Sequence, residues 1–189
     1  PYWIVLGDKE VENNKVTLIS LPRDIWLDSL KAKLNTAYLY GNEQGDGLTL
    51  AKKSVEEVVG QPIHYAVVID FSGFTKMIDS LGGVEVEVQT SFTDYKYPIA
   101  GKENDLCGGD LTYACRYETI SFIAGKQMMN GETALKFARS RHAEGDEGTD
   151  FARSARQQKV IDGIINKVLS SNLIFNPEKI SELIKIVES

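Results

Sequence analysis

Strand-like and helix-like segments alternate along most of this chain, and the alternation restricts the folds that it can adopt. Two β-rich runs, Tyr2–Leu6 and Val16–Leu21, flank a polar stretch containing Asn13-Asn14-Lys15, which predicts paired strands joined by a turn. Apolar residues at helical spacing in Leu48–Val59, followed by Gly60, predict a helix. Strands interleaved with helices favour the α/β class, and we expect a three-layer α/β/α sandwich with a central mixed β-sheet.

The middle of the chain continues this alternation. Tyr65–Ile69 is a run rich in β-branched residues that predicts a buried strand, and Phe71–Leu81 carries apolar residues at helical spacing. Val84–Val88 alternates valine with glutamate, as in a strand with one face in water. Residues 91–120 are rich in Tyr, Thr and Gly without a clear period, so we expect an irregular excursion containing one hairpin.

Three helices are expected in the last third of the chain. Asn130 is suited to cap a helix over Gly131–Ala138. A second helix is predicted from near Asp150 to about Leu169, and Pro177 opens a third.

The bulk properties fit a single domain spanning residues 1–189. The length supports one core of ordinary size, and no segment approaches the roughly 20 apolar residues that a membrane span needs. The formal net charge of -6 argues against general nucleic-acid binding, because that affinity depends on many Lys and Arg contacts to phosphates. We therefore expect no nucleic-acid partner, and any polyanion to be bound locally.

The only two cysteines, Cys107 and Cys115, leave two interpretations open. A pair at this spacing with no histidine nearby is a poor metal site. A disulfide that closes a small loop would suit an extracytoplasmic location, whereas two free thiols in a surface loop explain the sequence equally well.

The helix after Asp150 carries the first sign of a ligand site. Its apolar residues recur at the 3.6-residue period of a buried stripe: Ile161, Ile164, Ile165 and Val168. The same stripe, continued toward the N-terminus, reaches Gln157 and Arg153, and polar side chains on a buried stripe indicate a polar group opposite them. Arg156 lies off the stripe, nearer its rim. The start of the helix, with Asp150 as its cap, favours anions.

Arg139 and Arg141 come shortly before this helix. On an extended segment, residues at i and i+2 project to one side, while Ser140 faces away. The acidic loop 142–149 is long enough to fold the pair back onto the helix start. Four arginines would then converge on a phosphate or pyrophosphate ligand: Arg139, Arg141, Arg153 and Arg156.

Arginine suits such a site because its planar guanidinium pairs bidentately with phosphate oxygens and keeps its charge. The competing interpretation is that these arginines are solvated or paired with the acids of the same loop, Glu144, Asp146 and Glu147. The stripe position of Arg153 and Gln157 favours the ligand interpretation for those two residues.

Residues outside this region give weaker signals. Arg23 follows the end of a strand, where α/β proteins commonly place ligands, and Lys33 and Asn35 add donors in a nearby segment that is equally well explained as a surface loop. The remaining candidates show no spacing typical of a metal site or a catalytic triad: His64, His142, Asp70, Asp79 and Asp94.

Six segments together resemble the LytR-CpsA-Psr family in order, wording and spacing, over about residues 15 to 165. They are Ser20–Asp24, Lys33–Tyr38, Ile69–Phe74, Asp79–Val84, Met129–Arg141 and Asp150–Gln158. The resemblance implies an α/β/α protein on the outer face of the bacterial cytoplasmic membrane, anchored there by an N-terminal helix. We accordingly expect an excised domain whose anchor precedes Pro1.

The resemblance also implies an activity. Family members transfer glycopolymers, such as teichoic acids or capsular polysaccharide, from a polyprenyl-pyrophosphate carrier to a muramic acid hydroxyl of peptidoglycan. The expected partners are therefore the polyprenyl-pyrophosphate-linked glycopolymer, peptidoglycan and membrane lipid. Tyr65–Ile69 and Phe71–Leu81 would line an apolar groove for the lipid or, as apolar stripes more often do, fill the core.

Roles in the site follow from the same resemblance. The pyrophosphate would be held by four arginines and a glutamine: Arg23, Arg139, Arg141, Arg153 and Gln157. Arg156 would add positive field, Lys33 and Asn35 would add donors, and Asp150 would orient an arginine or assist the acceptor hydroxyl.

The family holds magnesium through two acidic residues and an arginine upstream of the first of these strands, and Tyr2 falls where the second Asp is expected. Either that Asp lies before Pro1, or this domain lacks part of the metal site, so magnesium is expected without assigned ligands. A domain without the acids would be a non-catalytic binding module for polyprenyl phosphate or an anionic wall polymer. Regulation of transcription is disfavoured by the acidic charge.

Overall fold

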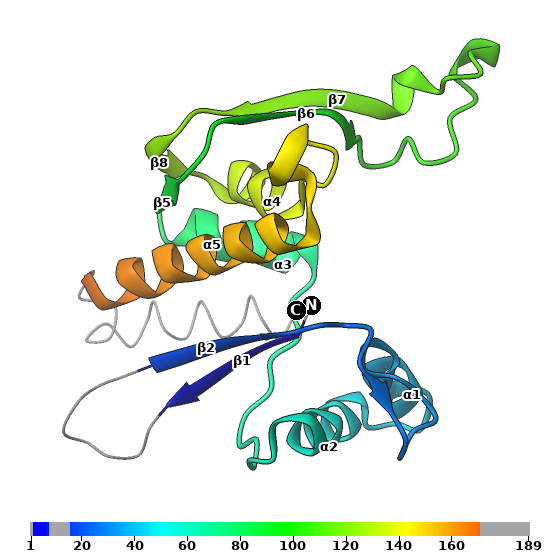
Figure 1. Ribbon diagram of the computed structural model, residues 1–189, viewed down its shortest axis with the longest axis vertical. Helices are drawn as coiled ribbons and strands as arrows, with labels where there is room; N and C mark the ends of the chain where they lie inside the picture. The colour runs from blue at the N-terminus through cyan, green and yellow to red at the C-terminus, as the bar shows by residue number, and fades with distance from the viewer. Residues whose placement is uncertain (1, 8–15, 171–189) are drawn as a thin grey trace. The chain divides into compact units, whose positions relative to one another are not determined.

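The computed structural model describes residues 2–7 and 16–170, and the chain forms two compact units, Pro1–Val68 and Ile69–Ser189 (Figure 1). Each unit combines helices with strands, which confirms the α/β class. Strands among the described residues pair two at a time, in separate two-stranded sheets. The central mixed sheet and the single domain over residues 1–189 therefore stay predictions.

The first unit contains the predicted N-terminal strand pair. Strand β1 (Tyr2–Gly7) runs antiparallel to β2 (Val16–Leu21), with Tyr2 opposite Leu21. The predicted turn at Asn13-Asn14-Lys15 lies outside the described residues. Two short strands follow and pair with each other, β3 (Trp26–Leu27) and β4 (Ala32–Lys33).

Helices complete the first unit: the 3-10 turn η1 (Leu34–Thr36), α1 (Ala37–Glu43) and α2 (Gly47–Val59). Helix α2 begins where Asp46 accepts a hydrogen bond from Thr49 N, and it ends at Gly60, whose φ of 69° is left-handed. The helix predicted over Leu48–Val59 is confirmed. Four buried residues of this unit form a small hydrophobic cluster: Leu21, Leu27, Leu34 and Val55.

The buried strand predicted at Tyr65–Ile69 is wrong. The segment has no regular secondary structure, and the side chain of Tyr65 is 91% exposed. It lies where the first unit passes into the second, and no strand in the described ranges pairs with it. A run of β-branched residues becomes a buried strand only when neighbouring strands and helices cover it, because β-propensity mainly reports packing.

The second unit is built on a long antiparallel ribbon. Strand β5 (Val84–Val88) pairs with β8 (Gly125–Met129), and β6 (Phe92–Pro98) pairs with β7 (Tyr117–Phe122). The alternation predicted for Val84–Val88 is confirmed, since its three valines are buried. The hairpin expected within residues 91–120 is formed by β6 and β7 with an irregular connection between them, whereas β8 was not predicted.

Three helices lie on one side of this ribbon (Figure 1). They are α3 (Phe71–Ser80), α4 (Gly131–Arg139) and α5 (Asp150–Ser170), all close to their predicted bounds. Asn130 caps α4 as predicted, accepting from Thr133 N at 2.8 Å. Gly131 lets α4 approach α3 closely, because a Cβ there would meet the carbonyl oxygen of Thr75. The helix predicted after Pro177 lies outside the described residues.

The core of the second unit joins the ribbon to the helices. Phe92 and Phe122 from the ribbon and Phe137 from α4 pack as neighbouring rings, with centroids 5.0–6.0 Å apart. Helix α5 meets β5 at Gly163, where a Cβ would lie 2.6 Å from the carbonyl oxygen of Glu85. Across the described part of the chain, no helix has the length and apolar character needed to cross a membrane.

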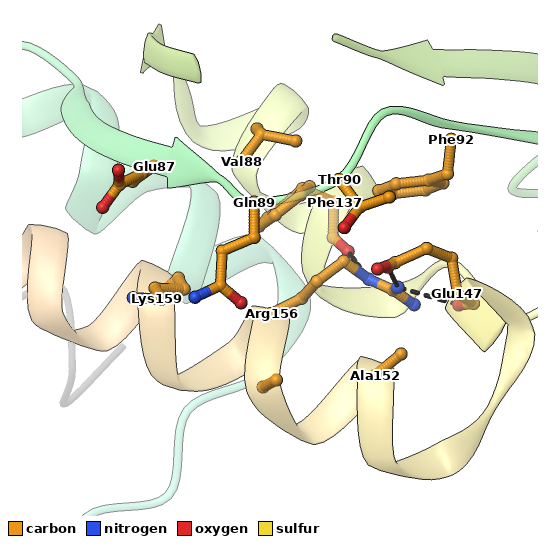
Figure 2. A pocket seen from close by; sticks show the side chains of 11 residues that line it. Glu87, Val88, Gln89, Thr90, Phe92, Phe137, Glu147, Ala152, Arg156 and Lys159 are labelled. Atoms are coloured by element: carbon orange, nitrogen blue, oxygen red, sulfur yellow. Dashed lines mark hydrogen bonds and ion pairs between the residues drawn. The ribbon is translucent and has the colours of Figure 1, made fainter. Parts of the chain in front are cut away.

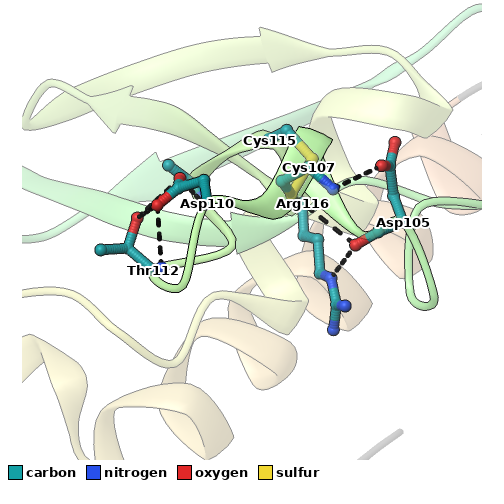
Figure 3. The surroundings of a disulfide bond; sticks show 7 residues. Asp105, Cys107, Asp110, Thr112, Cys115 and Arg116 are labelled. Atoms are coloured by element: carbon teal, nitrogen blue, oxygen red, sulfur yellow. Dashed lines mark hydrogen bonds between the residues drawn. A yellow bond between two sulfur atoms is a disulfide. The ribbon is translucent and has the colours of Figure 1, made fainter.

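The connection between β6 and β7 forms a tip, residues 99–116, that Figure 1 shows running out beyond the helices of its unit. It carries two 3-10 turns, η2 (Cys107–Gly109) and η3 (Ala114–Arg116). Cys107 and Cys115 are joined in a disulfide (Figure 3). Nearby, Asp110 accepts from Thr112 N at 2.9 Å, and Arg116 Nε donates to the Asp105 carbonyl at 2.7 Å. The disulfide interpretation is therefore the one that the structure adopts.

Reduction of this disulfide is expected to open the tip to proteases, because cross-linking a loop of this length removes about 2–3 kcal/mol of chain entropy from the open state. Chymotrypsin should then cut at the exposed Leu111 and at Tyr113. Limited proteolysis of the oxidised and the reduced, alkylated protein, followed by mass spectrometry, measures the difference. The Cys107→Ser/Cys115→Ser double variant should be cut at the same bonds without reductant. Equal rates for all three proteins would contradict this prediction.

Candidate functional site

Helix α5 begins with a threonine cap. Ala152 N donates to Thr149 Oγ1 at 3.2 Å, and Arg153 N donates to the Thr149 carbonyl at 3.1 Å. The prediction that Asp150 is the cap is therefore wrong, because Thr149 already holds that position in an extended conformation. Asp150 lies one residue later, in the first turn, and its carboxylate is left for side-chain partners.

Asp150 joins two of the predicted site arginines. Its Oδ1 lies 2.8 Å from Nη1 of Arg153 and 3.5 Å from Nη2 of Arg141. The Arg153 side chain is only 13% exposed, whereas the Asp150 carboxylate and the Arg141 side chain reach solvent. Two guanidiniums thus share one carboxylate at the positive end of a helix dipole, an arrangement that suits an anion.

Arg139 has different neighbours. It is the last residue of α4, so the extended segment predicted to carry both Arg139 and Arg141 does not include it. Its guanidinium lies 3.9 Å from the ring centroid of Phe71 and 5.9 Å from that of Tyr97, which are cation–π distances. Burial raises the pKa of Tyr97, and the charge of Arg139 opposes that shift. The participation of Arg139 in the site stays a prediction.

Arg156 is the most buried of the four arginines, which corrects its predicted place at the rim of the helix. The residue is 4% exposed, and the residues of α5 that are fully buried with it are Val160 and Gly163. The large apolar residues of α5 predicted that a different face of the helix is buried. The face that approaches β5 is instead the one with Gly163, where there is no room for a Cβ. Ile161 and Ile165 are consequently only half-buried.

The hydrogen bonds of Arg156 are structural ones. Its Nε donates to the Phe137 carbonyl at 3.1 Å, Nη2 to the Ser140 carbonyl at 2.8 Å, and Nη1 to the carbonyl and carboxylate of Glu147 at 2.8 and 2.7 Å. Figure 2 shows the side chain reaching toward Glu147 past Phe92, whose ring centroid lies 4.7 Å from the guanidinium carbon. The competing interpretation, pairing with an acid of the loop 142–149, therefore holds for Arg156.

The surroundings of Arg156 offer little room for a ligand. Burial lowers the pKa of its guanidinium, while the hydrogen bond and charge of Glu147 oppose that shift. The pocket beside it in Figure 2 has a volume of about 40 Å³, which is enough for water but not for a lipid pyrophosphate. Arg156 is thus expected to act on a ligand only indirectly. Its positive charge acts at a distance, and its hydrogen bonds hold the backbone of Phe137 and Ser140 in place.

Gln157 directly follows Arg156 on α5. Its Nε2 donates to the Ala138 carbonyl at 3.3 Å, whereas its Oε1 is buried without a hydrogen-bond partner. A carbonyl oxygen complements a donor, such as a hydroxyl, and repels a phosphate oxygen. A pyrophosphate contact by Gln157, which stays a prediction, would use the second N–H of its amide nitrogen.

Asp94 is the residue near the site that sequence reasoning missed. It lies on β6 and is 0% exposed. Its Oδ2 accepts from Ser140 Oγ at 2.7 Å and from the backbone N–H groups of Arg141 and His142, each at 3.1 Å. The available signal was its spacing from Phe92, because residues two apart on a strand share a face, and a carboxylate on a buried face needs partners.

Asp94 should make the stability of the protein depend on pH. Burial alone would raise its pKa, but hydrogen bonds from Ser140, His142, Lys96 and Arg141 hold the pKa below its ordinary value. A group with a lowered folded-state pKa contributes stability above its unfolded value, about 3.9, and loses it as the pH falls through the folded value. We expect Asp94→Asn to unfold at lower urea concentration than wild type at pH 7, and the gap to narrow below about pH 4.

The measurement is the urea midpoint at several pH values. Asp162→Asn is the matched control, because Asp162 is an exposed carboxylate on α5 in the same unit. A gap between Asp94→Asn and wild type that stays constant from pH 7 to pH 3 would contradict the prediction.

Three predicted residues belong to the first unit, and two of them contact Asp24. Arg23 Nε lies 3.3 Å from Asp24 Oδ2, Lys33 Nζ lies 2.9 Å from Asp24 Oδ1, and Asn35 N donates to the Arg23 carbonyl at 3.1 Å. These side chains are exposed. They form a small polar cluster of their own, and their participation in the site of the second unit stays a prediction.

No carboxylate cluster suited to magnesium occurs in the ranges that the structure describes. Asp70 caps α3 through Gly73 N, and Asp79 accepts from Gly131 N at 2.7 Å. One group of potential ligands comes together, Asp105 with Cys107 and Cys115, but its sulfurs are joined to each other and Mg²⁺ prefers oxygen ligands. The described residues therefore do not fit a magnesium ion, and magnesium stays a prediction.

Comparison with known proteins gives a consistent result. Residues 4–189 match the LytR_cpsA_psr family. The polyisoprenyl-teichoic acid–peptidoglycan teichoic acid transferase TagU of Enterococcus faecalis is 32% identical over 172 residues, which cover 89% of this chain and 47% of the relative. The chain spans about half the length of the curated relatives it matches.

Solved structures agree with this match. A protein of Enterococcus faecalis described as a transcriptional regulator superposes with a TM-score of 0.62 at 31% identity, over 91% of this chain and 53% of that one. A LytR-CPS2A-psr family protein, YwtF (TagT) with bound octaprenyl pyrophosphate lipid, superposes with a TM-score of 0.54 at 25% identity, over 92% and 62%.

Proposed function

The chain belongs to the LytR_cpsA_psr family, and from this premise we propose that it transfers a cell-wall glycopolymer from a polyprenyl-pyrophosphate carrier to peptidoglycan. The observation that carries the proposal is the convergence of Arg141 and Arg153 on Asp150 at the start of α5. A relative named as a teichoic acid transferase and a relative with bound octaprenyl pyrophosphate support the substrate class.

The proposed chemistry is a phosphoryl transfer. A hydroxyl of the peptidoglycan sugar attacks the phosphorus that carries the glycopolymer, a new phosphodiester forms, and the bond to the polyprenyl phosphate breaks. The hydroxyl proton leaves to solvent, and the leaving polyprenyl phosphate takes the bonding electrons as negative charge. Such a reaction needs positioning and charge neutralisation more than covalent participation by the protein.

Arg141 and Arg153 would supply that neutralisation. Guanidiniums pair bidentately with phosphate oxygens, and the positive end of α5 adds to their field. Asp150 touches both arginines, which supports the orienting role among the two predicted for it. Arg139, Arg23, Gln157, Lys33 and Asn35 complete the proposed set of ligand contacts.

The same proposal covers features for which the described residues give only partial support. The two units would belong to one three-layer α/β/α domain on the outer face of the cell membrane, held there by an N-terminal anchor. The exposed apolar residues of Tyr65–Ile69 would meet the lipid chain. Magnesium would add charge neutralisation at the pyrophosphate, with no ligand assigned in this chain.

The test is to incubate the protein with magnesium, a polyprenyl-pyrophosphate-linked oligosaccharide and peptidoglycan fragments, and to follow the products by mass spectrometry. Transfer should yield the glycan-phosphate on muramic acid together with polyprenyl phosphate. Release of polyprenyl phosphate without acceptor would show pyrophosphatase activity of the same site. Binding without either product would establish the binding module instead, and no binding at all would overturn the proposal.

A parallel arm with duplex DNA addresses the regulator description of the Enterococcus faecalis structure. We expect no retention of the DNA at physiological salt, because the chain carries a formal net charge of -6 and DNA affinity comes largely from phosphate neutralisation. A mobility shift at that salt concentration would favour the regulatory reading.

A further inference from the structure

Ser140, the residue between Arg139 and Arg141, is held from two sides. It is 0% exposed. Its hydroxyl donates to the Asp94 carboxylate at 2.7 Å, and its carbonyl accepts from Arg156 Nη2 at 2.8 Å. One side chain of β6 and one of α5 therefore meet on the residue that separates the two arginines.

The contacts extend along the chain in both directions from Ser140. Asp94 also accepts from the N–H groups of Arg141 and His142, and Arg156 also binds the Phe137 carbonyl. In the backbone at the end of α4, the N–H groups of residues 141 and 142 thus donate to a buried carboxylate. The carbonyls of residues 137 and 140 accept from a buried guanidinium. Charge-assisted hydrogen bonds of this kind hold geometry strongly when they are shielded from water.

Fold stability alone is a poor explanation for such an arrangement. Buried charged groups contribute little net stability compared with apolar residues of the same volume, because their desolvation offsets their attraction. Their distinctive effect is directional, because each hydrogen bond that they make requires its donor and acceptor in defined positions. A ligand site benefits from that effect, because a side chain that is already in place loses less entropy on binding.

We propose that Asp94 and Arg156 are positioning residues that hold the backbone of Ser140 and Arg141 so that the Arg141 guanidinium stays beside Asp150 and Arg153. The inference rests on the proposed function, because it assigns Arg141 to pyrophosphate binding. Neither Asp94 nor Arg156 touches the ligand. Both act through the segment between α4 and α5.

The experiment measures the affinity for inorganic pyrophosphate by isothermal titration calorimetry at pH 7. Ser140→Ala removes the hydroxyl but keeps the fold of the segment, and Asp94→Asn removes the charge at nearly constant volume. Each is expected to weaken binding about tenfold, the usual effect of losing a hydrogen bond to a charged group. Ser121→Ala is the matched control, because it removes a hydroxyl pair with Thr93 on the same hairpin, and it should bind as wild type.

A double-mutant cycle separates positioning from general destabilisation. If Ser140 and Asp94 act through Arg141, their substitutions should cause no further loss in an Arg141→Ala background. Equal losses with and without Arg141 would overturn the inference. Ser140→Ala alone decides the outcome if Asp94→Asn does not fold.

The same titrations distinguish failure of this inference from failure of the proposed function. If Arg141→Ala and Arg153→Ala bind pyrophosphate as wild type does, the proposed site itself is wrong. If those two variants lose affinity while Ser140→Ala keeps it, the site stands and the positioning inference is wrong.

Discussion

Arg153→Ala is expected to lower kcat/KM for glycopolymer transfer by about 100-fold to 1,000-fold, as for other donors that meet charge developing in a transition state. The Arg153 side chain is only 13% exposed, and its Nη1 lies 2.8 Å from Asp150 Oδ1. A cation shielded from water acts more strongly on a phosphate than an exposed one. The rate of polyprenyl phosphate release in the presence of peptidoglycan fragments measures this effect.

Two further variants define what Arg153 contributes. Arg153→Lys keeps the charge but loses the planar fork, so its rate should fall between those of wild type and Arg153→Ala. Arg116→Ala is the matched control, because Arg116 lies in the tip and stacks on Tyr113. Far-ultraviolet circular dichroism confirms that each variant is folded. A rate for Arg153→Ala within twofold of the Arg116→Ala rate would remove Arg153 from the site.

Arg156→Met is expected to lower the free energy of unfolding by about 3–5 kcal/mol, the usual effect of breaking a buried ion pair by removing one partner. The substitution leaves the Glu147 carboxylate and the carbonyls of Phe137 and Ser140 without their donor. The two tryptophans, Trp3 and Trp26, belong to the first unit. Hydrogen exchange of the α4 and α5 amides in the second unit is therefore the appropriate measurement.

The neighbouring cation on the same helix provides the control. Lys159→Met removes a positive charge of α5 that is only half-buried, and its effect should stay below about 1 kcal/mol. Adding Glu147→Leu to Arg156→Met should recover part of the lost stability, because the unpaired carboxylate is then gone. Unchanged amide exchange in Arg156→Met would mean that the observed hydrogen bonds carry no net stability.

The structural elements that depend on neighbouring residues agree well with their predictions. The Asn130 cap, the Gly60 terminus and the alternation of Val84–Val88 all appear as expected. Helix periods, caps and strand alternation depend on residues a few positions apart, so these parts of the fold can be predicted from a single sequence. The arginine pattern and the family resemblance predict an anion site in the second half of the chain, and that site stays a prediction.

Tyr65–Ile69 and Arg156 show where that reasoning fails. The apolar run lacks a partner strand among the described residues, and the charged residue is buried because Gly163, rather than a large apolar residue, faces β5. Asp94 is a third case, since it meets Ser140 across 46 positions of the chain. Contacts of this range depend on which faces pack together, and one sequence carries no direct record of that.

Sequence alone therefore singled out the four arginines, predicted the helix that carries Arg153 and Arg156, and suggested the class of ligand. Only the tertiary structure divided the four arginines into different roles. Arg141 and Arg153 share Asp150, Arg139 stacks on Phe71, and Arg156 is committed to internal carbonyls. The physical reason is that a guanidinium has the same charge and shape everywhere in the chain, whereas its burial and its partners are set by residues far away in sequence.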